Sequence, residues 1–197
     1  MFECFKTKHI HKPKEQSTLT VPSAATFSQM KIEVHGLDNF TIAEKEKFMK
    51  AMLIGELVLN SWDFRMEVMS SSFTESKGMS GKQIWELICT GQDLFNTKED
   101  HDIDVFVTMY DNFWTGTVGY TFKDTFKTWF NNKFFRNFDE AEILGNVIHE
   151  AMHNIGFEHR DLVNKLTSVP YKIGYIAREI ARKQMKGEML SPLLRKT

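Results

Sequence analysis

Alternating apolar and polar residues predict the strands of this chain. Five segments carry the period or the composition of strands: residues 30–36, 64–70, 102–110, 117–122 and 127–135. In the second segment, Phe64, Met66 and Val68 fall on one side, as a half-buried strand requires. The last two segments are rich in aromatic and β-branched residues, which favour pleated backbone. The pattern therefore predicts five strands.

Apolar residues at helical spacing predict helices in four further segments: residues 41–62, 80–91, 138–157 and 171–185. Thr41 and Glu44 have the spacing of a capping box at the start of the first helix. Ser80 and Gln83 have the same spacing at the start of the second, and Gly91 is its expected stop. These signals predict where the helices begin and end.

The order of these elements predicts a mixed α+β fold in which helices pack on one sheet. We expect a single domain over residues 28–190. Residues 1–27 are basic at first and then rich in Ser, Thr, Ala and Pro, and they show neither the helical nor the strand period. They are therefore expected to form a flexible arm or pro-segment. Residues 191–197 are interpreted as a C-terminal tail.

Composition excludes several classes of protein. The 197 residues are 42% hydrophobic, enough for a sizeable core, and the formal net charge of −1 favours neither a nucleic acid nor a membrane as partner. Two cysteines, Cys4 and Cys89, cannot make a disulfide framework. The sequence has no transmembrane run of apolar residues and no signal-peptide core. We therefore expect a cytoplasmic or virion-associated protein.

The stretch HEAMHNIGFEH, residues 149–159, contains three of the seven histidines. His149 and His153 are four residues apart, so on a helix both imidazoles leave the same face and can bind one zinc ion. Glu150 stands beside the first histidine, where a carboxylate can take a proton from a water molecule that the metal activates. Gly156 can end the helix with a positive φ, and the turn can bring His159 back as a third ligand.

A solvated, histidine-rich helix is the simpler interpretation of two histidines and a glutamate. The full pattern H-E-x-x-H-x-x-G-x-x-H is far rarer by chance than HExxH alone, and it lies on a helix that the apolar spacing predicts separately. Three protein nitrogens leave a fourth position for water, which is typical of catalytic zinc rather than structural zinc. We therefore predict a catalytic Zn²⁺ site.

This stretch resembles the signature of the metzincin zinc peptidases. The resemblance implies that His149, His153 and His159 bind zinc and that Glu150 is the general base. It also implies a twisted five-stranded sheet with a long backing helix, an active-site helix and a C-terminal helix. An edge strand within residues 117–135 would bind peptide in extended form, and residues 160–175 would wall the pocket for the residue after the cut.

The chain departs from the family pattern after the third histidine. Metzincins carry a methionine turn there, and residues 166–174 contain no methionine. Pro170 and Tyr171 stand where matrixins have these residues, whereas Lys172 occupies the place of the astacin tyrosine. Arg160 matches no subfamily residue. The sequence thus resembles an outlying metzincin, of the small kind that bacteriophages encode.

Other residues carry weaker hypotheses. His9 and His11 could chelate a metal, and the lysines of the same arm could touch an acidic surface, but both are more often simply solvated. Cys4 could reach the zinc from a pro-segment and hold an enzyme latent. Tyr171 and Tyr175 could donate to an oxyanion, although a tyrosine at a helix start is more often packed.

Two functions remain open from the sequence. The first is a zinc-dependent endopeptidase that acts on a peptide or protein substrate, with Glu150 as general base. The second is a structural or interaction component of a larger assembly that keeps the fold, binds a partner protein and cleaves little. The intact Glu150 favours the first, and the missing methionine favours the second.

Overall fold

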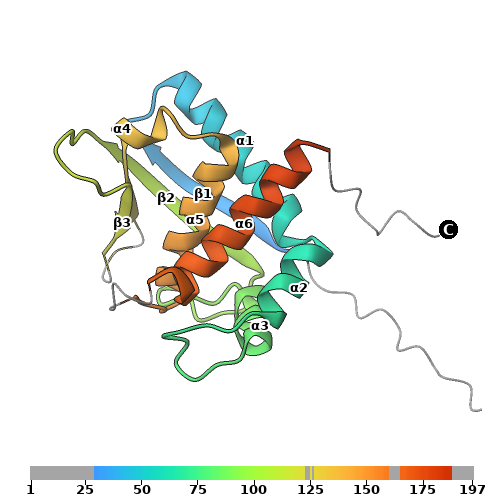
Figure 1. Cartoon of the computed structure of the whole chain (residues 1–197). Helices are drawn as coiled ribbons and strands as arrows, with labels where there is room; N and C mark the ends of the chain where they lie inside the picture. The colour runs from blue at the N-terminus through green and yellow to red at the C-terminus, as the bar shows by residue number, and fades with distance from the viewer. Residues whose placement is uncertain (1–28, 123–124, 126, 160–164, 188–197) are drawn as a thin grey trace, which may run out of the picture.

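The computed structural model describes residues 29–122, 125, 127–159 and 165–187. In chain order the elements are β1 (Lys31–Asp38), α1 (Ile42–Leu59), α2 (Trp62–Ser70), α3 (Gly81–Thr90), β2 (Asp102–Tyr110), β3 (Gly119–Thr121), β4 (Lys127–Asn131), α4 (Asn132–Phe135), α5 (Glu140–Asn154), the 3₁₀ turn η1 (Lys165–Thr167) and α6 (Val169–Met185). The expected mixed α+β class is confirmed (Figure 1).

An open sheet forms one layer of the molecule. Its order is β1-β2-β4-β3 over the described residues, with β1, β2 and β4 parallel and β3 antiparallel to β4 at the edge. On β2, the side chains at Ile103, Val105, Val107 and Met109 are buried and alternate with half-exposed ones. One face of the sheet therefore belongs to the core, as the alternation predicts.

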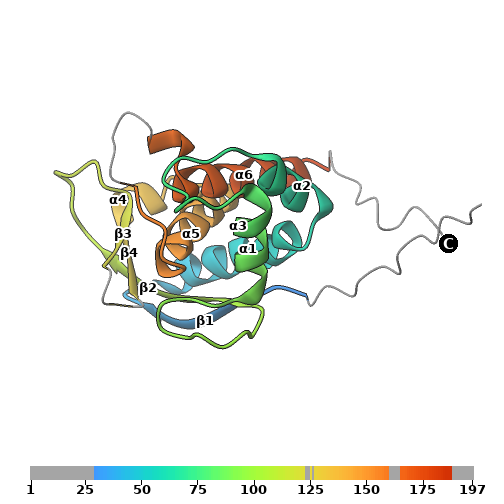
Figure 2. The same cartoon turned by 90° about the horizontal axis from the view of Figure 1, so that it is seen from below.

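Helices cover that face of the sheet. Figure 2 shows α1 and α5 lying against the strands and α6 lying beyond them, on the side away from the sheet. The side chains of Phe48, Phe64, Phe130 and Phe135 are all almost fully buried between these layers. The active-site helix of the sequence prediction, α5, is thus the central element, packed between the sheet and α6.

The prediction of five strands was wrong, because residues 64–70 lie in α2 rather than in a strand. Ser61 begins this helix, and its Oγ accepts a hydrogen bond of 3.2 Å from the amide of Phe64. Phe64 and Val68, which are one turn apart, are fully buried, whereas Met66 is 42% exposed. Burial at positions i and i+4 fits both periods, so alternation over seven residues could not distinguish them.

Several predicted boundaries also shift. The segment 127–135 leaves the sheet at Asn131, whose Oδ1 accepts the amide of Lys133 and so starts the short helix α4. The expected strand 117–122 is ordered as β3 over only Gly119–Thr121. The first helix ends at Leu59, and Trp62 already belongs to α2.

The predicted helix caps are confirmed. Thr41 and Glu44 form a reciprocal capping box at the start of α1, in which each side chain bonds the other residue's amide. Ser80 and Gln83 do the same at α3. Gly91 follows α3 with φ of 70°, the left-handed conformation that favours glycine.

The arm at 1–27, with Cys4, His9 and His11, and the tail at 191–197 lie outside the described residues. Among the helices that are described, none combines the length and the apolar character needed to cross a bilayer.

Helices α5 and α6 cross with almost no space between their backbones. A Cβ atom at Gly174 would lie 2.5 Å from the carbonyl oxygen of Gly145 and 3.1 Å from the Cβ of His149. A Cβ at Gly145 would lie 2.9 Å from the Cβ of Arg178. Real Cβ atoms do not approach backbone so closely, so both glycines are required by this packing.

We predict that Gly174→Ala lowers the free energy of unfolding by about 1–3 kcal/mol, because the added methyl group overpacks a rigid crossing. Thermal or denaturant unfolding measures this loss. Gly116→Ala is the matched control, since a Cβ there would meet nothing within 4 Å. Equal stability of the two variants would contradict the close crossing.

Candidate metal centre

The C-terminal turn of α5 places the third histidine. The amide of Phe157 donates a hydrogen bond to the carbonyl of Met152 at 2.9 Å. The amide of Gly156 donates one to the carbonyl of His153 at 2.9 Å. These are the two hydrogen bonds of a Schellman motif, and Gly156 has φ of 102°. The helix therefore stops at the expected glycine, and the chain returns toward its last turn at His159.

The three predicted ligands converge. His149, His153 and His159 each offer a ring nitrogen, and these nitrogens lie within 4.8 Å of one another. The ring centroids are 5.1 Å apart for His149 and His153, 5.3 Å for His149 and His159, and 4.9 Å for His153 and His159. One cation could therefore be shared by all three imidazoles.

A backbone carbonyl orients one of the three imidazoles. The Nδ1 of His153 lies 2.8 Å from the carbonyl oxygen of Phe157. The backbone of Pro170 acts to raise the pKa of His149, and the backbone of His159 acts in the same direction on its own ring. A ring whose N–H is held in this way keeps its other nitrogen free as an acceptor, which is the arrangement of metal-binding histidines.

The electrostatics favour neutral imidazoles. Burial lowers the pKa of His149 to about 3, and the nearby His153, His159 and Lys165 act in the same direction. Burial is also the main cause that lowers the pKa of His153 and of His159. All three rings are therefore unprotonated at neutral pH, the state in which imidazole binds a metal ion.

Glu150 lies beside the cluster in an apolar position. Its Oε1 is 4.0 Å from the Nε2 of His149, and only 6% of the residue is exposed. Burial raises the pKa of Glu150 to about 7, against a smaller opposite effect of a hydrogen bond from Thr121. Its Oε2 meets no hydrogen-bond partner among the described residues. A buried carboxylate oxygen left in this way is available to a proton or to a water molecule.

The ring of Tyr171 packs against two of the histidines. Its centroid lies 4.3 Å from that of His149, edge to face, and 4.7 Å from that of His159. The Nζ of Lys165 lies 4.5 Å from the Tyr171 ring centroid. Tyr175, in contrast, is 56% exposed and contacts Arg178, so the structure brings only the first of the two candidate tyrosines to the cluster.

A cleft of about 810 Å³ opens over the histidines. Residues 116–122, which contain the edge strand β3, line it together with His149, Glu150 and residues 156–159. An edge strand thus lies where the sequence placed one, within residues 117–135, and borders the cluster directly. A cleft of this size holds several residues of a peptide.

Two further groups of possible ligands lie on the outer face of the sheet. Glu33, His35 and Asp104 form one, and Asp100, Asp102 and Asp104 form the other. These side chains are exposed or half-exposed, and His35 already contacts Asp104. Burial together with the charges of Asp100 and Asp104 raises the pKa of Asp102 to about 6. Exposed carboxylates of this kind are common without an ion, so we assign no site to them.

Comparison of the chain with protein-family models, with curated proteins and with solved structures finds no match. The interpretation of the cluster therefore depends on its residues and their geometry.

Sequence reasoning missed residues that distant segments bring to the site. Lys77 precedes α3, Thr121 is in β3, and Lys165 begins η1, yet all three line the cleft. A lysine or a threonine in a loop carries no local signal of such a role. Gly174 could have been suspected, because a glycine inside a helix costs stability and often marks a close contact. Arg160 lies outside the described residues.

We predict that the purified protein binds about one zinc ion per chain and that His153→Ala removes it, since two remaining imidazoles hold zinc poorly. Metal analysis after dialysis measures the zinc content. His35→Ala is the control: this histidine contacts Asp104 on the outer face of the sheet and should leave the zinc content unchanged. Equal zinc content in the two variants would mean that the cluster is not the metal site.

Proposed function

We propose that this protein is a zinc-dependent endopeptidase of the metzincin type. The observation that carries the proposal is the convergence of three neutral imidazoles, within 4.8 Å of one another, beside the buried carboxylate of Glu150. The mixed α+β fold and the edge strand over the cleft are compatible with it. The absence of a methionine from residues 166–174 makes the chain an outlying example of the type.

The donor set fits zinc. Three imidazole nitrogens suit a borderline-soft cation, and the described residues supply no fourth ligand to this group. His149, His153 and His159 would hold the ion, with the carbonyl of Phe157 orienting the ring of His153. Bound there, zinc would supply Lewis acidity to the peptide carbonyl and to the attacking water.

Glu150 performs the proton transfer in this proposal. Burial raises the pKa of its carboxyl group, and the positive charge of a bound zinc ion would act in the opposite direction. Glu150 takes a proton from the attacking water at one oxygen and gives it to the nitrogen of the departing amine. Its partnerless Oε2 is free to accept the first proton without breaking a hydrogen bond to the described residues.

The edge strand β3 positions the substrate in this proposal. Among the described strands β3 pairs with β4 alone, and Gly119, Tyr120 and Thr121 line the cleft. An extended peptide can pair with such an edge through main-chain hydrogen bonds that do not depend on its sequence. The scissile bond would then run alongside β3 past the three histidines.

An assembly component is the second candidate, and one surface favours it. The outer side of α1 exposes large apolar side chains at helical spacing, namely Ile42 (79% exposed), Met49 (42%), Leu53 (63%) and Leu57 (67%). Met49, Leu53 and Leu57 follow one another at intervals of four residues, and an exposed apolar row of this kind typically marks a contact with another protein. Such a role would need neither Glu150 nor the cleft.

We predict that Glu150→Gln keeps the fold and the zinc but loses peptidase activity by at least about 10²–10⁴-fold, the usual contribution of a general base. Digestion of a broad peptide library, with and without chelator, measures the activity, and metal analysis measures the zinc.

Glu142→Gln is the matched control on the same helix. Its side chain caps α5 and contacts Arg182, away from the histidines, and glutamine can serve in a capping box. This variant should cleave as the wild type does. Cleavage by Glu150→Gln would contradict the mechanism, and a zinc-loaded wild type that cleaves nothing would favour the assembly role.

A further inference from the structure

Two lysines in the wall of the cleft form no ion pair with the described residues. These are Lys77 and Lys165. Glu150 and Glu158 line the same cleft, where Glu150 lies beside His149 and Glu158 has an interaction of its own. The positive charge of the wall is therefore local to the two lysine amines.

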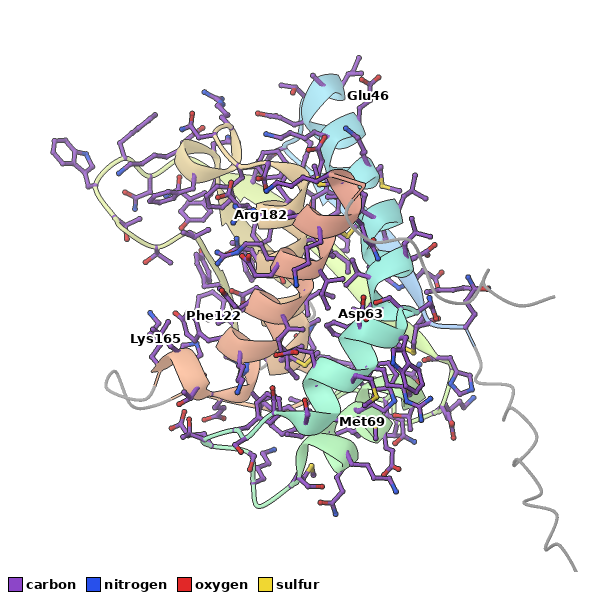
Figure 3. The ribbon with its side chains drawn as sticks, turned by 45° about the vertical axis from the view of Figure 1, so that its right-hand side comes forward. Glu46, Asp63, Met69, Phe122, Lys165 and Arg182 are labelled. Atoms are coloured by element: carbon purple, nitrogen blue, oxygen red, sulfur yellow. The ribbon has the colours of Figure 1, made fainter. Side chains whose placement is uncertain are left out.

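Lys165 is the lysine nearest to the proposed chemistry. Its Nζ lies over the ring of Tyr171, and that ring contacts both His149 and His159. In Figure 3 the labelled Lys165 lies on the same side of the molecule as the labelled Phe122, and both residues line the cleft. An extended peptide between β3 and α5 would pass next to this amine.

Lys77 lies near the turn that follows α5. Its Nζ is 5.8 Å from the ring centroid of Phe157. A Cβ atom built at Gly156 would lie 3.2 Å from this Nζ. Phe157 is the residue whose carbonyl holds His153. The two lysines therefore stand near different members of the cluster, so that a ligand reaching across the histidines meets positive charge from both.

A lysine amine attracts a carboxylate of the peptide. Solvent and salt screen this attraction less in a partly enclosed cleft than on an open surface. A basic side chain at the same place would be repelled by the amine. The charge of the wall therefore discriminates among peptides that the edge strand alone would bind equally.

We propose that the cleft selects acidic peptides, and that Lys165 binds the carboxylate of an aspartate or glutamate close to the cleaved bond, with Lys77 adding to the preference. The position of this residue relative to the cleaved bond rests on the proposed peptidase function. The preference for acidic peptides in binding does not depend on cleavage.

The experiment uses matched peptides that carry Glu, Gln or Lys at each position flanking the bond cut in the library digest. Gln has the shape of Glu without its charge, so the pair isolates the electrostatic contribution. Cleavage is measured with the zinc-loaded wild type, and binding is measured by calorimetry with zinc-loaded Glu150→Gln. If no bond is cut, the same substitutions are placed along a peptide that binds.

We expect the best Glu peptide to have a KM and a dissociation constant roughly 2- to 5-fold lower than its Gln counterpart, the usual size of an ion pair at a partly exposed site, with kcat unchanged. The Lys peptide should bind most weakly, and added salt should reduce the preference. Lys165→Met should remove most of it while keeping the melting temperature and the zinc content. Lys45→Met, on the exposed side of α1, is the control and should retain the full preference.

The outcomes separate this inference from the proposed function. A protein that cuts no peptide but prefers Glu peptides through Lys165 keeps the inference and loses the peptidase. Equal cutting of Glu and Gln peptides, or a preference that survives in Lys165→Met, overturns the inference and leaves the peptidase intact. Absence of binding to every peptide overturns both.

Discussion

The close crossing of α5 and α6 is the constraint on which the site depends. Gly145 and Gly174 let the two backbones meet, and the space left at Gly174 is bounded by the Cβ of His149 itself. The same approach brings the start of α6 to the histidines, so that the backbone of Pro170 acts on the pKa of His149 and the ring of Tyr171 packs against its imidazole. Because interiors are close-packed, a shift of α6 would also move His149, the first of the proposed metal ligands.

Much of the fold could be predicted from local patterns. The strand β2 and helix α5 were identifiable because each has one strict period, and the capping pairs at Thr41 and Ser80 mark where helices begin. The segment at 64–70 was assigned wrongly because its two deeply buried residues, Phe64 and Val68, fit a helix and a strand alike. The signal that decided it was the cap at Ser61, just outside the segment considered.

Only part of the candidate site could be predicted from the sequence. His149, Glu150, His153 and His159 were predictable because a helix and a single glycine turn relate them, and the structure brings them together. The lysines of the cleft were not predictable, because Lys77 and Lys165 come to its wall only through the tertiary packing of separate segments. The ring of Tyr171 packs against His149 and His159, in a chain whose residues 166–174 contain no methionine.

The burial of Glu150 bears on the choice between an enzyme and a scaffold. A buried carboxylate whose Oε2 lacks a partner among the described residues destabilises the folded state. A structural zinc site needs no such group and is typically closed by a fourth protein ligand. In this chain the carboxylate lies next to three histidines and lines a cleft bordered by a strand edge. The proposed function would account for that combination, because the burial that raises the pKa of Glu150 favours a group that can take a proton from water and give it to the leaving amine.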